Sequence, residues 1–266
     1  MRTSDAVQSI HALMPIVDLM GFPIHAIRES ACVEHIMTCV ARGQGGWIVT
    51  VNLDHLRRMV HEPGYRELCE GATMLVPDGM PLIWASRLRG TPLPERVTGS
   101  NLVSSLSKAA AQASVPIFLL GGNPGAAQGA AAILTRRYPA LRIAGTHCPE
   151  FGFEADPARI ASITSQLRRC RPGIVYVALG SPKQEVLIDR LRGCLPSAWW
   201  VGVGISFSYL TGEVPRAPRW MQTIGMEWLH RLWQEPQRLS RRYLLHDLPF
   251  AVRLLFGSAC QRWPSR

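Results

Sequence analysis

Short apolar runs alternate with helical stretches from residue 45 to about residue 205. Runs that are apolar throughout are typical of strands covered on both faces of a sheet, and they occur at 47–51, 73–76, 115–120, 141–144, 174–179 and 199–203. The segments between them have helical composition, at 81–89, 102–113, 125–138, 157–169 and 183–191. This repetition predicts an α/β fold with a mainly parallel, doubly wound sheet and helices on both faces. The first 44 residues add a predicted strand near 14–19 and a helix near 30–41.

The pattern changes after about Tyr209, and we predict a boundary between residues 1–210 and 211–266. The second part has nine arginines and four acids, a net charge of +5. Helical spacing places Trp228, Leu232, Leu239 and Tyr243 on one stripe, and Arg231, Arg238 and Arg242 on another. Pro236 is expected to break or kink the helix. A basic amphipathic helical appendage of this kind is typical of an interfacial membrane segment. The alternative is a helix pair packed on the domain's own core.

Charge narrows the choice of partners. The chain of 266 residues has a formal net charge of +10, and 27 of its 29 basic residues are arginines, with Lys108 and Lys183 as the exceptions. Such a balance favours an anionic partner, whether nucleic acid, a membrane surface or a phosphorylated substrate, although a coding bias toward arginine explains part of the excess equally well. Seven scattered cysteines without CxxC spacing favour a reducing cytosol. We predict neither a signal peptide nor a membrane-spanning helix.

Two glycine-rich turns follow predicted strands and open helices. Gly121-Gly122-Asn123 follows one strand, and Gly180-Ser181-Pro182-Lys183-Gln184-Glu185 follows another. Glycines let the backbone approach a ligand closely, and a helix N-terminus offers free N–H groups to an anion. Each turn could hold a diphosphate, with Lys183 adding a cation, but either could also be an ordinary turn.

Polar residues follow two further strands. Asp78, between Pro77 and Gly79, could act as a general base toward a sugar hydroxyl or simply cap the next helix. Thr50 and Asn52, two residues apart, would face the same side of a strand and suit a hydroxyl-rich ligand, or bond to the backbone of a turn. Arg96, in Glu95-Arg96-Val97-Thr98-Gly99, could offset a diphosphate's charge or form an ion pair with an acid.

Several function classes lack their motifs in this sequence. It contains no HxH, HExxH or DxD, so it indicates no metal site and no cofactor. It has no GxSxG elbow, which disfavours a serine hydrolase. No recognition motif is interleaved with the arginines, so we do not expect nucleic-acid binding.

Taken together, the five motifs resemble the WecG/TagA/CpsF glycosyltransferases, also called glycosyltransferase family twenty-six. They occur in the family's order across roughly residues 45–250. One departure is Val51, where proline often follows the threonine. The likeness is closest to the exopolysaccharide branch, which includes a xanthan glucosyltransferase.

The resemblance implies a Rossmann-like, inverting and metal-independent enzyme. Such an enzyme moves a sugar, with glucose the first expectation, from a UDP-sugar to a polyprenyl-diphosphate-linked monosaccharide at the cytoplasmic face of the inner membrane. By the same resemblance Asp78 is the base, Thr50, Asn52 and Gln184 orient substrate, and Arg96 binds the diphosphate. The substrate-binding residues would be Thr98, Gly121, Gly122, Asn123, Gly180, Ser181, Lys183 and Glu185. The appendage arginines facing acceptor phosphates or an anionic membrane surface would be Arg216, Arg219, Arg231, Arg238, Arg241 and Arg242.

Two points stay open at the level of sequence. A non-catalytic nucleotide-sugar sensor that docks a partner through its basic tail would carry the same turns and the same charge. A homo-oligomer formed through the core is also compatible with the sequence.

Overall fold

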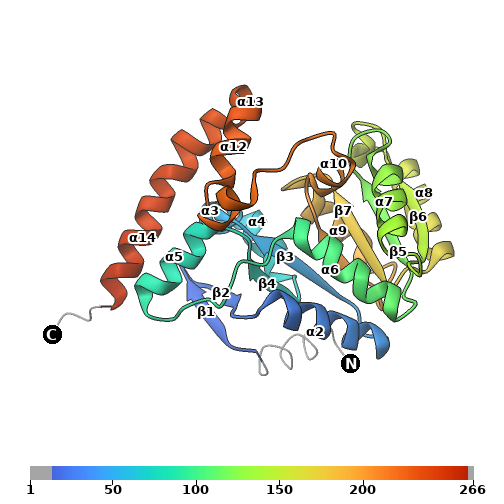
Figure 1. The fold of residues 1–266 in the computed structure, drawn as a ribbon, viewed down its shortest axis with the longest axis horizontal. Coiled ribbons are helices and arrows are strands. Elements are labelled where there is room, and N and C mark those ends of the chain that lie inside the picture. Colours follow the sequence, from blue (N-terminus) through green and yellow to red (C-terminus); the bar gives the residue numbers. More distant parts are fainter. Residues whose placement is uncertain (1–13, 263–266) are drawn as a thin grey trace.

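The central sheet confirms the predicted α/β class. The computed structural model describes residues 14–262, apart from the side chains of Arg238 and Arg262. Six parallel strands lie in the order β4-β3-β8-β7-β5-β6 (Figure 1). They are β3 (Gly46–Val51), β4 (Met74–Pro77), β5 (Ile117–Gly121), β6 (Ile143–His147), β7 (Ile174–Ala178) and β8 (Trp199–Gly202). A separate antiparallel hairpin is formed by β1 (Ile16–Leu19) and β2 (Phe22–His25).

Helices cover both faces of the sheet, because successive strand residues point to opposite sides. Ile48 and Ile174 pack in one apolar cluster, whereas Val49 and Val175 pack in the other. The first face is covered by α2 (Glu29–Ala41), α6 (Gly99–Gln112), α7 (Ala126–Arg137) and α10 (Ser206–Thr211). The second is covered by α3 (Leu53–His61), α4 (Pro63–Glu70), α5 (Met80–Arg89), α8 (Pro157–Cys170) and α9 (Lys183–Arg192). Each fully buried large side chain contributes about 1.5–3 kcal/mol, so the apolar strands fix the sheet between its two helix layers.

The predicted elements are confirmed, but β2, α3, α4, α10 and the short 3₁₀ helix η1 (Phe153–Ala155) were not predicted. The turn before β2 places Met20 and Gly21 at positive φ, 57° and 89°. A Met-Gly pair is a weak hairpin signal compared with Asn-Gly or Asp-Gly. Strand β6 begins and ends later than the predicted 141–144. It continues through Gly145, where a Cβ would lie 2.7 Å from the ring of Phe118.

The described part of the C-terminal appendage, residues 211–262, is a series of short helices followed by one long helix. Its elements are α11 (Arg219–Thr223), α12 (Glu227–Gln234), α13 (Pro236–Ser240), the π-helical segment η2 (Arg241–Asp247) and α14 (Leu248–Arg262). The predicted break at Pro236 is confirmed, since α12 ends at Gln234 and α13 begins at Pro236. Helix α14 runs along α5 (Figure 1), with Phe250 and Leu254 buried in the core cluster. No helix of residues 14–262 is long and apolar enough to cross a bilayer.

A buried cluster of charges ties the appendage to α3. Asp54, which is 1% exposed, accepts hydrogen bonds from Arg57 at 2.7 Å and Arg58 at 3.1 Å. Arg242 of the appendage lies 3.2 Å from the same carboxylate, and Asp247 lies 3.4 Å from both Arg57 and Arg242. These arginines hold the pKa of Asp54 below its ordinary value, although burial alone would raise it. The appendage is therefore docked by ion pairs as well as by apolar packing.

Large apolar side chains on the appendage face solvent. The exposed set, which we call the apolar face, comprises Trp220, Ile224, Trp228, Leu229, Trp233, Leu244, Leu245, Leu248, Val252 and Phe256. Trp84 and Leu88 of the adjoining α5 are exposed as well. So many large exposed apolar side chains on one short segment make it a candidate interaction surface.

Candidate active site

A cavity of about 910 Å³ lies where the carboxyl ends of the sheet strands meet the appendage. Residues at the ends of all six strands line it, from Thr50 of β3 to Gly202 of β8. This edge is where parallel α/β sheets bind ligands. The predicted residues in its wall are Thr50, Asn52, Asp78, Arg96, Thr98, Gly122, Asn123, Gly180, Ser181, Lys183, Gln184, Arg231 and Arg242. Gly121, Glu185, Arg216, Arg219 and Arg241 lie outside that wall.

Asp78 is partly exposed to this cavity and does not cap α5. The α5 N-cap is Gly79, without a side-chain hydrogen bond. Instead, Oδ2 of Asp78 accepts a hydrogen bond from the Gly99 N–H, at 3.4 Å, at the start of α6. Burial raises the pKa of Asp78 to about 7 and Glu227 adds to the rise, whereas Arg96, Gly99 and His55 oppose it. A carboxyl group with a pKa near neutrality is suited to general-base work.

Arg96 forms an ion pair with the appendage rather than with its sequence neighbour Glu95. Its Nη1 lies 3.0 Å from Oε2 of Glu227. Nε of Arg216 lies 3.3 Å from Oε1 of the same carboxylate, and Nη1 of Arg216 donates to Oδ1 of Asn101 at 3.0 Å. One appendage carboxylate thus bridges a core arginine and an appendage arginine beside Asp78.

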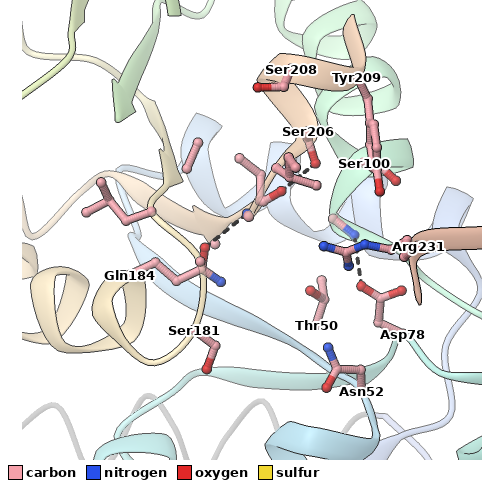
Figure 2. Close-up of a pocket in the computed structure, with 18 of the residues that line it drawn as sticks. Thr50, Asn52, Asp78, Ser100, Ser181, Gln184, Ser206, Ser208, Tyr209 and Arg231 are labelled. Carbon is pink, nitrogen blue, oxygen red and sulfur yellow. Dashed lines mark hydrogen bonds between the residues drawn. The ribbon is translucent and has the colours of Figure 1, made fainter. Parts of the chain in front are cut away.

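Arg231 brings a second guanidinium close to Asp78. Figure 2 shows its side chain reaching in from the appendage toward Asp78. Burial lowers the pKa of Arg231, but nearby Tyr209, Tyr243, Glu235 and Glu227 outweigh this effect and raise it. Because no carboxylate among the described side chains forms an ion pair with Arg231, its charge is available to an anionic ligand.

The other appendage arginines have different surroundings. Arg242 is engaged with Asp54 and Asp247 in the docking cluster. Arg219 and Arg241 are exposed at the surface. Arg238 lies outside the side chains that the structure describes.

Thr50 and Asn52 lie side by side near Asp78 (Figure 2). Thr50 is the fifth residue of β3 and is 7% exposed, close to the α6 N-terminus at Gly99. Asn52 caps α3, because its Oδ1 accepts a hydrogen bond from the His55 N–H at 3.1 Å. The amide NH₂ of Asn52 is left for the cavity, so the turn role and a ligand role are compatible.

Gln184 is held by protein groups at both ends of its amide. Its Oε1 accepts from the Gly204 N–H at 3.0 Å, and its Nε2 donates to Glu185 at 2.7 Å. Glu185 is 1% exposed and lies 3.4 Å from Nε2 of His55. Burial alone would raise the pKa of Glu185, but His55 and Gln184 hold it below its ordinary value. These contacts tie the start of α9 to α3 and to the loop after β8.

The first glycine turn has the geometry that its sequence requires. Gly121 and Gly122 have φ values of 95° and 85°. A Cβ on Gly121 would lie 2.7 Å from the carbonyl oxygen of Ala178, so only glycine fits between β5 and β7. Asn123 donates from Nδ2 to Glu213.

The second turn presents its charged residue at the rim. Lys183 Nζ lies 3.2 Å from Glu154 and 4.7 Å from the ring centroid of Phe151, which is 96% exposed. Ser181 Oγ lies 3.0 Å from the hydroxyl of Tyr65.

Thr98 caps α6, because its Oγ1 accepts a hydrogen bond from the Asn101 N–H at 3.1 Å.

Several residues of the cavity wall were not predicted. They include His55, Ser206, Ser208 and Tyr209 of the core, and Glu227, Trp228 and Tyr243 of the appendage. His55 could have been found as the third residue after Asn52, at the first turn of a helix. The others lie in the short helix α10 or in the appendage, where no sequence spacing indicates which side chains face inward. In the described part of the chain, no three His, Cys, Asp or Glu residues are grouped to hold a metal ion.

Comparison with known proteins assigns this arrangement to a family. Residues 17–263 match the model of the glycosyl transferase WecG/TagA/CpsF family. The chain belongs to this family. It is also 32% identical, over 197 residues, to an N-acetylglucosaminyldiphosphoundecaprenol N-acetyl-β-D-mannosaminyltransferase of Bacillus subtilis strain 168. The match covers 74% of this chain and 75% of that relative. The WecG/TagA/CpsF assignment makes the chain a glycosyltransferase, as its motifs predicted, and makes the cavity the candidate for its active site.

Proposed function

We propose that the enzyme transfers a sugar, with inversion and without a metal, from a UDP-sugar to a polyprenyl-diphosphate-linked monosaccharide. The name of the Bacillus relative, which acts on a diphosphoundecaprenol-linked sugar, supports this acceptor class. The observation that carries the proposal is the position of Asp78, a carboxyl group with a pKa of about 7, in the cavity next to Arg231.

The proposed reaction moves one proton to Asp78 and releases UDP as the leaving group. The acceptor hydroxyl attacks the anomeric carbon and gives its proton to Asp78, while the bond from that carbon to UDP breaks. The departing diphosphate gains negative charge, which Arg231 and Arg96 stabilise by charge-assisted hydrogen bonds. The N-terminus of α9 and the two glycine turns offer further N–H groups to the phosphates. Thr50 and Asn52 are placed to orient hydroxyl groups beside the base.

In this proposal, the appendage binds the membrane that carries the lipid-linked acceptor. Its apolar face and its exposed Arg219 and Arg241 suit the interface of an anionic membrane, where each basic residue contributes about 1 kcal/mol. We therefore propose peripheral attachment at the cytoplasmic face of the inner membrane. On this proposal residues 1–210 form the catalytic domain and 211–266 the acceptor- and membrane-binding unit. Self-association through the core remains part of the proposal.

Two donor sugars are proposed, and each has its own support. The likeness to the exopolysaccharide branch favours glucose, transferred through a β-1,4 linkage in exopolysaccharide assembly. The name of the Bacillus relative favours N-acetylmannosamine. A screen of UDP-sugars against lipid-diphosphate-glucose and lipid-diphosphate-N-acetylglucosamine, read by product mass, separates them.

The central test replaces the base. Asp78→Asn keeps the size of the side chain but cannot take a proton, so transfer should fall about 10²- to 10⁴-fold. UDP affinity, measured by calorimetry, should persist because the glycine turns and Arg231 are unchanged. Asp189→Asn, on the exposed face of α9, is the matched control. Near-parental turnover of Asp78→Asn would remove Asp78 from the role of base, and a parent that transfers no sugar would favour the sensor hypothesis.

A further inference from the structure

Glu227 is a carboxylate that the basic appendage places against the catalytic half of the molecule. It is the first residue of α12, and its side chain is 17% exposed. One oxygen lies 3.0 Å from Arg96 and the other 3.3 Å from Arg216. Neither the motifs nor the net positive charge of the appendage predicts that this acid contacts the core.

The loop before α6 touches both Glu227 and the proposed base. Arg96, in this loop, contacts Glu227. The Gly99 N–H, at the loop's end, donates to Asp78. Asn101, two residues later, accepts from Arg216, the second partner of Glu227. A movement of Glu227 therefore reaches the surroundings of Asp78 through a short run of directly bonded groups.

The charges around Asp78 differ in sign. Burial and Glu227 favour its protonated form, whereas Arg96, the Gly99 N–H and His55 favour the carboxylate. Arg231, reaching in from α12, adds a further positive charge on the same side. Among these neighbours Glu227 is the negative one, and it also neutralises Arg96. Removing it would leave the carboxylate of Asp78 facing positive groups alone, which stabilise the charged form and weaken the base.

We propose that Glu227 is a positioning residue through which the docked appendage occupies Arg96 and so prepares Asp78 to take the acceptor's proton. The inference rests on the proposed role of Asp78 as the base. With the appendage docked, Glu227 forms its ion pair with Arg96, and Asp78 is at its most basic. With the appendage withdrawn, Arg96 loses its ion pair and stabilises the carboxylate form of Asp78 more strongly. Asp78 is then a weaker base. Strong base catalysis is thereby confined to the closed cavity, in which a lipid acceptor is held.

The test titrates Asp78 directly in the full chain. The carboxyl ¹³C signal of Asp78, assigned by its absence in Asp78→Asn, is followed with pH in the parent and in Glu227→Gln. The midpoint should be lower in Glu227→Gln than in the parent. The ratio of the transfer rate at pH 6 to that at pH 8 should rise in the same variant. Glu227→Asp keeps the charge but draws it back by one methylene, so its midpoint should lie between those two, which answers the question if the Gln variant does not fold.

The control is Glu235→Gln, which removes a carboxylate from the other end of the same helix and also from the cavity wall. The midpoint of the Asp78 titration in Glu235→Gln should equal that of the parent. A midpoint in Glu227→Gln at or above the parent's, or an equal fall in Glu235→Gln, overturns the inference. If Glu227→Gln lowers the midpoint but Asp78→Asn still transfers sugar, the coupling stands and the proposed function fails instead.

Discussion

The two sides of the cavity are built by different physics. On the sheet side, Asn52, Thr98 and Gln184 are fixed by backbone hydrogen bonds at strand and helix ends. On the appendage side, Glu227 and Arg242 are held by ion pairs, and the outer surface is the apolar face. Contacts of the first kind follow from the register of a buried sheet, whereas those of the second kind depend on charge and surroundings. The sheet side therefore sets positions, and the appendage side is the part that pH and ionic strength can alter.

Replacing one tryptophan on each side gives the largest contrast. Trp200 is 1% exposed in β8, so Trp200→Ala should lower the free energy of unfolding by about 3–5 kcal/mol. Trp233 is 85% exposed on α12, and Trp233→Ala should change it by less than about 0.5 kcal/mol. Urea denaturation of both variants measures the difference. Equal losses would show that the appendage is as deeply packed as the sheet.

Removing the charge of Asp54 should loosen the appendage selectively. Asp54→Asn leaves Arg57 and Arg242 with one carboxylate, Asp247, and Arg58 with Glu62, which costs about 3 kcal/mol. Limited proteolysis should then cut the appendage faster, while the sheet resists. Glu70→Gln, whose ion pair with Arg66 is exposed, should leave the digestion pattern unchanged. Faster cutting throughout the chain would contradict a docking role for the cluster.

The buried carboxyl group of Asp78 should make the parent less stable at alkaline pH. The pKa of Asp78 is about 7 in the folded chain, above its ordinary value of 3.8, so the folded state holds a proton that the unfolded state has lost between these values. The stability that Asp78 contributes is complete below about pH 4 and is lost as the pH rises through about 7. Asp78→Asn should therefore be more stable than the parent at pH 8, by about 2 kcal/mol after allowance for partial exposure.

Thermal unfolding of both proteins at pH 4 and pH 8 checks this sign. The two should unfold at similar temperatures at the lower pH and separate at the higher one. If the parent unfolds at a higher temperature than Asp78→Asn at pH 8, the carboxylate of Asp78 is well solvated or paired.

Surface arginines should produce the smallest effect. Arg219→Ala combined with Arg241→Ala should weaken binding to anionic vesicles by about 1 kcal/mol for each residue, and raising the salt concentration should shrink the difference. Vesicle co-sedimentation measures it. Arg168→Ala, on exposed α8 far along the chain from the appendage, is the control. An equal loss in the control would indicate general charge attraction without a defined face.

The sequence predicts the sheet side better than the appendage side. Continuous apolar runs and glycine turns determine strands, helices and which loops share an edge, so Thr50, Asp78 and Gly122 could be placed at one rim. The hairpin turn at Met20 and the paired helices α3 and α4 carried only weak local signals. Their positions are decided by packing against β4 and α9.

Side-chain partners across the cavity could not be read from spacing. The pairing of Arg96 with Glu227 joins residues 131 positions apart. Arg231 and Arg242 share a periodic stripe, yet Arg231 points toward Asp78 and Arg242 forms an ion pair with Asp54. Periodicity gives the face of one continuous helix, but α12 ends at Gln234 and a new helix begins at Pro236, between the two residues.

Buried and exposed tryptophans mark the two sides of the described molecule. Trp47, Trp199 and Trp200 are buried in the sheet, whereas Trp220 and Trp233 of the appendage are open to solvent, and Trp84 of α5 and Trp228 of the cavity wall are partly exposed. Indole emission shifts to the blue when its surroundings lose water, so the interior set gives a constant background and the outer set an optical signal of contact. The unlabelled molecule can thus report by its own fluorescence when the apolar face leaves water, and iodide quenching can tell the two sets apart.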